Sequence, residues 1–407
     1  MIGKILLVAA LVTQMPDQVG HDTKGGFERC DSVINKAIED GNAPGAVLCV
    51  VQGDSIVYEK AYGNKRVYPK TEPMTEETVF DLASLSKCVG TTIAAMQLVE
   101  QGLLGLDDYV DEYLPGFAPW TDSTGTVSKR ITVRQLMTHT SGLAPVANVL
   151  ELGRRHADNR PEKLRAYIIK ELDRRAEPGT GLMYSCPNFI TLQYIIESLT
   201  GERLCDYAQT HIFDALGLQH TCYFPTNRRI PKATLATIAP TEVIWRRTTD
   251  PQQFGRPTRW RKALLGQVHD PTARRFNCGN SGNAGVFSNA EDLAVICAAI
   301  MNGGEYRGRR ILRPETVELM CTEQEGAFGR ALGWDASSGA AWIEGETFAA
   351  DHTVCHTGYT GTSIVIDLDR KIAVILLANR VHPADEGGLG RTRAAVSQIV
   401  AESLKND

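Results

Sequence analysis

The chain has 407 residues, of which 43% are hydrophobic, and its formal net charge is −5. A chain of this length buries a large core and is expected to form more than one domain or subdomain. This charge balance indicates neither a nucleic-acid partner nor binding to an anionic membrane surface. The ten cysteines form no Cys-x-x-Cys pair and no zinc-type spacing with histidines, so we predict no metal site and no cofactor.

The N-terminus combines a charge with a short apolar run. Lys4 precedes residues 5–12, which carry no charge. This pattern is typical of a secretory signal, and the run is too short to cross a bilayer. Residues 1–26 are therefore expected to be a leader and linker of an exported or periplasmic protein. No small-x-small cleavage site follows, and the scattered cysteines favour a reducing compartment, so a buried N-terminal strand in a cytoplasmic protein is the alternative.

Hydrophobic spacing predicts the elements in chain order. Residues 27–40 form an amphipathic helix. Two strands at 46–52 and 55–62 are joined by Gly53-Asp54, a strong hairpin signal. The other predicted helices lie at 88–101, 162–174, 189–199, 203–216, 290–302 and 314–320 and at the end of 384–405. The other predicted strands lie at 331–334, 363–368 and 372–378.

The order of these elements indicates the fold class. Strands come from the two chain ends and helices from the middle, which predicts an α/β plus all-α protein. Its antiparallel sheet is built from both chain ends and flanked by helices. We expect this sheet subdomain to comprise residues 27–80 and 285–407, and a mainly helical subdomain to comprise residues 81–284.

Residues 80–87 hold the only Ser-x-x-Lys of the chain. They open the predicted helix that ends before Gly102, so Ser84 and Lys87 share one helix face. A serine hydroxyl is a weak nucleophile at its own pKa, and an adjacent amine can activate it. The helix start adds N–H groups that favour developing negative charge. An ordinary helix start with a surface lysine is the alternative.

Three later segments would complete such a site. Tyr184 follows a Pro-Gly turn at a helix start, where its phenol could act as a general base; half-buried packing is the alternative. Residues 354–362 are rich in glycine and small residues before a strand, which offers backbone N–H groups to a substrate or forms a simple turn. His269 and Asp270 could form an acid–base pair or only order a loop.

The ordered set Ser-x-x-Lys, Tyr-x-x and His-Thr-Gly resembles the serine β-lactamase and penicillin-binding protein family, in its class C-like branch. That branch includes D-alanyl-D-alanine carboxypeptidases, D-aminopeptidases, esterases and acyltransferases. The resemblance runs from about residue 31 to the C-terminal helix. It implies that Ser84 is the acylated nucleophile, Lys87 its proton partner and Tyr184 the general base, alone or with Lys87. It places the oxyanion hole at the N–H groups of Ser84 and Tyr359.

Two positions depart from that family's pattern. Cys186 stands where the family has Asn or Asp, and Asn188 is a nearby amide that could compensate. His356, followed by Thr357 and Gly358, stands where β-lactamases more often have lysine, so a fixed positive charge is lost. Both departures argue against efficient β-lactam hydrolysis, and neither affects acylation of Ser84. A catalytic role for the Cys186 thiol is a further, less favoured interpretation.

We therefore expect a serine hydrolase that acts through acyl-Ser84 on an amide or ester. A cell-wall D-Ala peptide or a carboxylic ester is favoured over a β-lactam. The alternatives are an acyltransferase that moves a small acyl group to an alcohol, and a slow-turnover penicillin-binding sensor. The partner is a small-molecule, peptide or ester substrate, and the oligomeric state is not predicted.

A basic stretch at residues 245–262 carries two tryptophans and six Arg or Lys residues. Arginine binds carboxylates bidentately, so a lid that recognises a carboxylate or an acyl chain is one interpretation. A solvated loop is the other. The stretch lacks the features of a nucleic-acid-binding motif.

Overall fold

A computed structural model of the chain describes residues 24–156, 159–224, 229–243, 262–336, 348 and 352–404. The predicted leader up to residue 23 and the basic stretch up to residue 261 lie outside the described residues. Within the described part, no helix has the length and apolar character needed to span a membrane.

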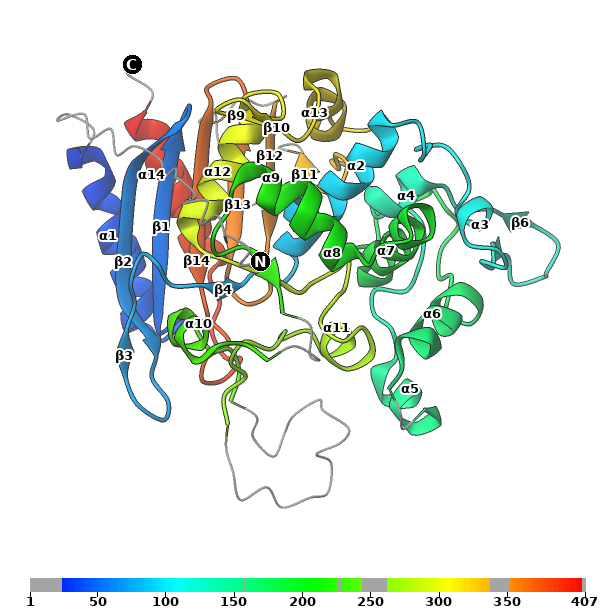
Figure 1. The fold of residues 1–407 in the computed structure, drawn as a ribbon, viewed down its shortest axis with the longest axis horizontal. Coiled ribbons are helices and arrows are strands. Elements are labelled where there is room, and N and C mark those ends of the chain that lie inside the picture. Colours follow the sequence, from blue (N-terminus) through cyan, green and yellow to red (C-terminus); the bar gives the residue numbers. More distant parts are fainter. Residues whose placement is uncertain are drawn as a thin grey trace, which may run out of the picture.

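The centre of the fold is a seven-stranded antiparallel sheet in the order β11-β12-β13-β14-β1-β2-β3 (Figure 1). Its strands are β1 (Gly45–Gln52), β2 (Ser55–Arg66), β3 (Glu72–Pro73), β11 (Asp335–Ala336), β12 (Thr353–Thr357), β13 (Ser363–Asp367) and β14 (Ile372–Ala378). Strands β1 and β14 pair from Ala46↔Ala378 to Gln52↔Ile372, so the two chain ends meet in mid-sheet. The predicted sheet from both ends, and the hairpin at Gly53-Asp54, are confirmed.

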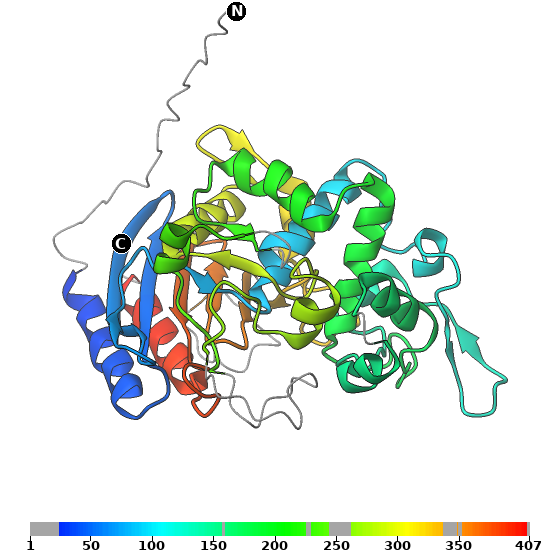
Figure 2. The same ribbon diagram turned by 60° about the horizontal axis from the view of Figure 1, so that its bottom comes forward.

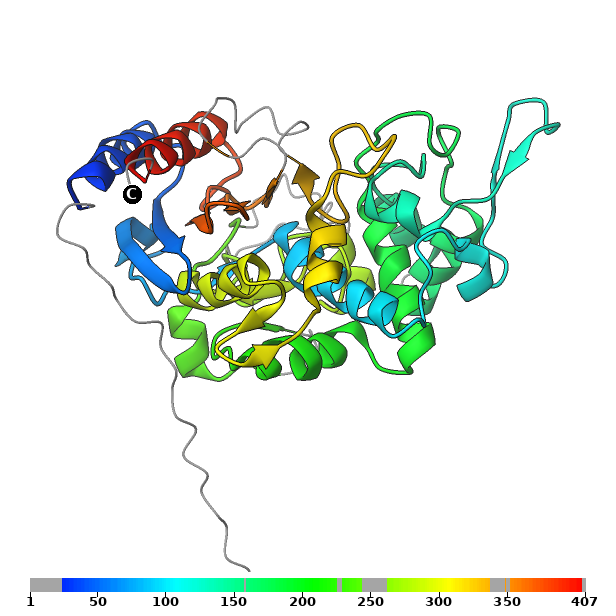
Figure 3. The ribbon, with the colours of Figure 1, turned by 90° about the horizontal axis from the view of Figure 1, so that it is seen from above.

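Helices cover both faces of this sheet (Figure 3). One face carries α1 (Lys24–Glu39) and α14 (Gly390–Ser403), and the other carries α12 (Ala290–Met301). Successive side chains of a strand point to opposite faces of the sheet, so apolar residues along β1 pack against helices on both faces. Leu48 and Val50 lie in the apolar cluster beneath α1 and α14. Val47 and Cys49 lie in the larger cluster on the other face.

The middle of the chain is mainly helical and lies beside the sheet (Figure 1). Its helices are η1 (Lys87–Thr92), α2 (Ile93–Glu100), α3 (Val110–Tyr113), α4 (Val133–Met137), α5 (Val149–Arg155), α6 (Pro161–Lys170), α7 (Cys186–Thr200), α8 (Leu204–Ala208), η2 (Gln209–Phe213), α9 (Asp214–Leu216), α10 (Lys232–Thr237), α11 (Pro271–Phe276) and, further on, α13 (Pro314–Cys321). The helices η1 and η2 are π-helical turns, a rare form that is frequently found at functional sites.

Short strand pairs complete the architecture. Strands β4 (Phe80–Asp81), β8 (Val286–Ser288) and β7 (Cys222–Tyr223) form a small sheet in that order. The hairpin of β5 (Trp120–Thr121) and β6 (Ser128–Lys129) projects from the helical side (Figure 2). Strands β9 (Glu305–Tyr306) and β10 (Arg309–Arg310) form another hairpin.

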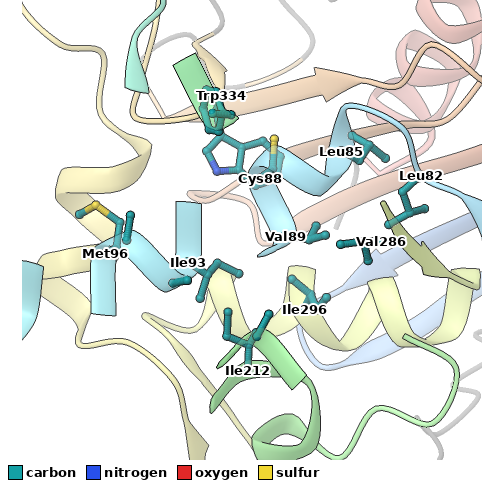
Figure 4. Packing of buried hydrophobic residues seen from close by; sticks show 14 of the residues in the cluster. Leu82, Leu85, Cys88, Val89, Ile93, Met96, Ile212, Val286, Ile296 and Trp334 are labelled. Atoms are coloured by element: carbon teal, nitrogen blue, oxygen red, sulfur yellow. The ribbon is translucent and has the colours of Figure 1, made fainter. Parts of the chain in front are cut away.

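The continuous helix η1–α2 runs through the core. Figure 4 shows its apolar side chains packed among residues of η2, β8, α12 and the turn before β11. The labelled members are Leu82, Leu85, Cys88, Val89, Ile93, Met96, Ile212, Val286, Ile296 and Trp334. Burial on all sides fixes the start of this helix, where Ser84 and Lys87 lie.

The strand predicted at residues 331–334 is wrong. Pairing with the sheet begins only at Asp335, and Gly333 has a left-handed φ of 80° that a strand does not allow. The amides of this segment bond elsewhere: Leu332 N–H donates to the carbonyl of Met320 and Gly333 N–H to that of Met137, at 3.1 and 3.0 Å. The apolar composition of residues 331–334 predicted their burial correctly, but their backbone bonds to distant segments and not to a neighbouring strand.

Candidate active site

The Ser-x-x-Lys pair is assembled at the start of η1. Lys87 is fully buried, and its Nζ donates to Ser84 Oγ at 2.9 Å and to the carbonyl oxygen of Asn283 at 3.0 Å. Burial acts to lower the pKa of Lys87, but electrostatic interactions with Cys186 and Tyr184 outweigh it and the pKa is raised. The amine is therefore a protonated donor held on the serine hydroxyl.

A buried carboxylate shapes the turn that presents Ser84. Ala83 has a left-handed φ of 47°, which costs a non-glycine residue about 1 kcal/mol. Its N–H donates to Asp81 Oδ1 at 2.9 Å, and the other carboxylate oxygen accepts the N–H of His269 at 2.6 Å. Asp81 thus ties the turn to the loop before α11.

The Gly-rich segment after β12 is clamped to the same turn by two hydroxyls. Thr360 Oγ1 donates to the carbonyl of Asp81 at 2.7 Å, and Thr362 Oγ1 donates to that of Leu82 at 3.0 Å. Gly358 passes so close that an added Cβ would lie 2.4 Å from the Leu82 carbonyl oxygen. The third motif is therefore held against the nucleophile turn.

Two backbone amides are available at this junction. In the described part of the chain, no backbone carbonyl accepts a hydrogen bond from Ser84 N–H or from Tyr359 N–H. These are the groups that the family resemblance assigns to the oxyanion hole. Their role stays a prediction, supported by the way the Thr360 and Thr362 hydroxyls join the two segments.

Tyr184 is positioned by hydrogen bonds from the backbone N–H groups of the residues on either side of it. Met183 N–H donates to the carbonyl of His139, and Cys186 N–H donates to that of Pro145, both at 2.9 Å. Between them, Ser185 N–H donates to His139 Nδ1 at 3.1 Å. The Tyr184 side chain is 39% exposed, and the centroid of its ring lies 5.0 Å from Lys87 Nζ. The structure thus brings Ser84, Lys87 and Tyr184 together.

Two neutral histidines flank the tyrosine. The ring centroid of Tyr184 lies 4.2 Å from that of His139 and 6.0 Å from that of His356. Both histidines are buried, and burial, followed by the positive charges of Arg330 and Lys87, lowers their pKa values well below 6.5. His356 therefore does not supply the fixed charge of the family's usual lysine.

Hydrogen bonds fix the tautomer of each ring. His356 Nδ1 lies 2.8 Å from the carbonyl of Thr357, which only accepts, so Nδ1 carries the proton. His139 Nδ1 accepts from Ser185 N–H, so its proton is on Nε2. Neither Nε2 atom has a hydrogen-bond partner among the described residues. The site therefore contains one free acceptor and one free donor.

Replacing His356 by glutamine is expected to reduce the free energy of unfolding that the protein loses as the pH falls. Because the folded pKa lies below the unfolded value, the unfolded chain alone takes up this proton, and stability falls as pH drops below 6.5. The wild type should lose about 1 kcal/mol more than the variant between pH 6.5 and about pH 5.5. Urea unfolding at the two pH values measures this, and equal losses would contradict it.

Cys186 and Asn188 take different positions. Cys186 begins α7, and its thiol interacts electrostatically with Lys87, so it borders the site. Asn188 is fully buried, and its amide oxygen accepts from Ser141 Oγ at 2.6 Å. Its Nδ2 lies 3.1 Å from His139 Nδ1. The Asn188 amide thus holds the loop of His139, and the hypothesis that it compensates for Cys186 stays untested.

His269 and Asp270 lie at the edge of the site. The Asp270 carboxylate caps α11 by accepting the N–H of Ala273 at 2.7 Å, as expected of a residue that orders a loop. The His269 ring stacks on Tyr359, with centroids 5.6 Å apart and planes at 19°. The guanidinium of Arg380 lies 4.6 Å from the Tyr359 centroid. Tyr359 is 55% exposed and follows Gly358 in the segment that is held against the turn of Ser84.

Four residues of the site were not predicted from sequence as site residues: Asp81, His139, Asn283 and Arg330. His139 lies directly after a helix pattern, in the stretch 136–143 that resembles the family's sequences, but the sequence assigned no role to the histidine. The others depend on contacts between distant segments. In the described residues, no group of three or more His, Cys, Asp or Glu side chains could hold a metal ion.

The sequence matches the family described as Beta-lactamase over residues 30–398. It is 30% identical over 384 residues to an Escherichia coli (strain K12) protein named "Putative D-alanyl-D-alanine carboxypeptidase", which covers 91% of this chain and 86% of that protein. A Salmonella typhimurium protein of the same name is 31% identical over 388 residues, with the same shares covered.

Solved structures agree on the fold. EstCE1, described as a hydrolase with promiscuous acyltransferase activity, superposes with a TM-score of 0.69 at 26% identity, over 93% of this chain and 99% of that one. A penicillin-binding protein homologue from Caulobacter crescentus gives a TM-score of 0.68 at 17% identity, over 96% and 100%. The family resemblance and the fold class are thereby confirmed. The chain belongs to the β-lactamase family and is a serine hydrolase with the β-lactamase/transpeptidase-like fold.

Proposed function

We propose that the protein hydrolyses uncharged carboxylic esters through an acyl-Ser84 intermediate. The observation that carries this proposal is the contact of Lys87 Nζ with Ser84 Oγ at 2.9 Å, at the start of a buried helix and beside the exposed Tyr184. A hydroxyl that is held by an ammonium and lies close to a separate group able to accept its proton is arranged for nucleophilic attack.

The chemistry follows from the donors and acceptors. Protonated Lys87 can only donate, so the Tyr184 oxygen takes the proton as Ser84 Oγ attacks the ester carbonyl. The Ser84 and Tyr359 amides stabilise the tetrahedral oxyanion. Collapse breaks the bond to the alcohol, which receives the proton from Tyr184. Water then attacks acyl-Ser84 by the same route and releases the acid.

The absence of a positive charge at His356 supports an uncharged substrate. His356 is neutral at the position where a lysine would attract a carboxylate, and Cys186 offers only a weakly hydrogen-bonding thiol. Two exposed apolar side chains lie close to site residues in the chain: Leu182 is two residues before Tyr184, and Val146 follows Pro145, whose carbonyl accepts from Cys186 N–H. Apolar surface near the site would favour an acyl chain over a charged peptide end.

A D-alanyl-D-alanine carboxypeptidase activity is the second candidate, because relatives with about 30% identity carry that name. Acyl transfer to an alcohol is a variant of the first candidate, since EstCE1 is described with such an activity. In that case, the alcohol in place of water attacks acyl-Ser84. A cell-wall substrate would also require export, which the predicted leader at residues 1–26 would provide.

A substrate panel tests the proposal. We expect short- and medium-chain p-nitrophenyl esters to show kcat/KM values at least about tenfold above those of diacetyl-lysyl-D-Ala-D-Ala and nitrocefin, since an unmatched charge costs about 1.4 kcal/mol or more. Ser84→Ala should abolish every activity. A D-Ala peptide as the fastest substrate would replace the ester proposal with the second candidate, and persistent acyl-enzyme without release would indicate a sensor.

A further inference from the structure

His139 is fully buried and takes a backbone conformation that residues with a side chain rarely adopt. Its φ is 59°, in the left-handed region, where the β-carbon crowds the following carbonyl oxygen. Such a conformation persists only where the surrounding structure enforces it, and it is concentrated at functional sites. In the turn after α4, Thr138 N–H donates to the carbonyl of Arg134 at 2.9 Å. Thr140 N–H donates to that of Gln135 at 3.0 Å, so the residues on either side of His139 hold the turn in this form.

Two acceptors of His139 bind the residues around Tyr184. Its carbonyl accepts the N–H of Met183 at 2.9 Å, and its ring Nδ1 accepts the N–H of Ser185 at 3.1 Å. These are the residues directly before and after Tyr184 in the chain. The side-chain Nδ2 of Asn188 lies 3.1 Å from the same ring nitrogen and helps to hold the imidazole. A single histidine therefore fixes the backbone on both sides of the tyrosine.

The His139 ring also lies against the Tyr184 ring. The two centroids are 4.2 Å apart, with the planes at 34°, and the imidazole lies 5.2 Å from the ring of Phe189. Lys87 Nζ lies 5.0 Å from the Tyr184 centroid. Because Tyr184 is 39% exposed, it has open space on its solvent side, and the contact with His139 restricts the rotamers of its ring. A general base is effective only while it stays within reach of the proton that it removes.

We propose that His139 is a positioning residue that holds the Tyr184 phenol in the orientation from which it takes the proton of Ser84. The inference rests on the proposed acyl-enzyme function. The imidazole is a neutral support, because burial keeps its pKa well below 6.5 and a backbone N–H occupies its Nδ1. Its contribution is geometric: two backbone bonds and one ring contact keep the tyrosine in place while Ser84 Oγ attacks.

Replacing His139 by asparagine separates the ring contact from the other contacts of this residue. Asparagine is enriched among the non-glycine residues of the left-handed region, so the turn should be kept. Its side-chain oxygen can replace Nδ1 as the acceptor for Ser185 N–H, whereas the contact with the Tyr184 ring is lost. We expect acylation of Ser84 to slow by about 30-fold, within the roughly 10²-fold that a displacement of about 1 Å can cost.

A double-mutant cycle with Tyr184→Phe distinguishes positioning from a purely structural role. The readout is the rate constant for Ser84 labelling by a fluorophosphonate, followed by intact mass. In this reaction the Ser84 Oγ–P bond forms, the P–F bond breaks, fluoride leaves and Tyr184 takes the serine proton. His139→Asn should slow labelling by about 30-fold in the wild type, but by less than about threefold in Tyr184→Phe, where the hydroxyl that it positions is absent. A residue that only stabilises the fold would slow both proteins equally.

Two further variants complete the experiment. His211→Asn is the matched control, because His211 lies against Tyr207 with similar ring geometry, with centroids 4.4 Å apart and planes at 37°, on a helix that supplies no residue to the site. Its replacement should change the labelling rate constant by less than about twofold. Asn188→Ala removes the second neighbour of His139 Nδ1 and decides the question if His139→Asn does not fold. It should slow labelling by about fivefold, and this loss should also disappear in Tyr184→Phe.

The proposal is overturned if Ser84 is labelled but His139→Asn reacts as fast as the wild type. It is equally overturned if His139→Asn slows labelling by the same factor with and without the Tyr184 hydroxyl. No labelling of the wild type would instead refute the acyl-enzyme function.

Discussion

Replacing Lys87 by methionine is expected to lower the rate of Ser84 acylation by about 10⁴-fold. The ammonium is fully buried and makes two hydrogen bonds, to Ser84 Oγ and to the Asn283 carbonyl. Methionine fills a similar volume, so the packing of η1 is largely kept while the charge and both bonds are lost. Steady-state hydrolysis of a p-nitrophenyl ester gives the change in kcat/KM.

Lys60→Met is the matched control for this variant. Lys60 is a partly exposed lysine of β2 that pairs with Asp31, on the side of the sheet covered by α1. Its loss should change kcat/KM by less than about threefold, since such pairs contribute little. A Lys87→Met enzyme that keeps more than about a tenth of wild-type activity would show that the amine is not part of the acylation machinery.

Replacing Tyr184 by phenylalanine is expected to lower kcat/KM by about 10³-fold. Phenylalanine keeps the ring contact with His139 at 4.2 Å and the ring face near Lys87, and removes only the hydroxyl. The backbone hydrogen bonds of Met183 and Cys186 do not involve the Tyr184 side chain, so the fold should be unaffected. The loss should appear in the acylation step, which a burst experiment isolates from deacylation.

Tyr58→Phe controls for the loss of a phenol. Tyr58 OH donates to Asp31 at 2.9 Å, beneath α1 and away from Ser84. Activity should be kept there, with a small loss of stability from the missing hydrogen bond. If Tyr184→Phe kept wild-type kcat/KM while Lys87→Met lost it, the general base would be Lys87 alone, and the pathway proposed for the proton would be wrong.

The sheet could be predicted because its evidence is local. Short, nearly continuous apolar runs in β1, β13 and β14 and a two-residue turn at Gly53-Asp54 indicate buried strands and a hairpin directly. The order of motifs along the chain then identified Ser84, Lys87 and Tyr184 as candidates. The structure places these three side chains around one point, although they come from two segments about 100 residues apart.

Other parts of the site depend on contacts that local patterns do not encode. Arg330 lies directly before the segment 331–334 that was predicted to be a strand, and the position of this segment depends on Gly333 bonding to Met137 and Cys88. The left-handed Ala83 is held by a carboxylate, which local propensity does not indicate for alanine. The π-helical η1 likewise has no recognised sequence signal.

The measurement that tests the central claim most directly is intact-mass analysis after treatment with a fluorophosphonate, for the wild type and for Ser84→Ala. We expect one adduct per wild-type chain, located by peptide mapping to the segment that contains Ser84, and none on the variant. Because the serine hydroxyl contacts the Lys87 amine, labelling should also be slowed strongly in Lys87→Met. An unlabelled wild type, or an adduct that persists in Ser84→Ala, would contradict the assignment of Ser84 as the acylated nucleophile.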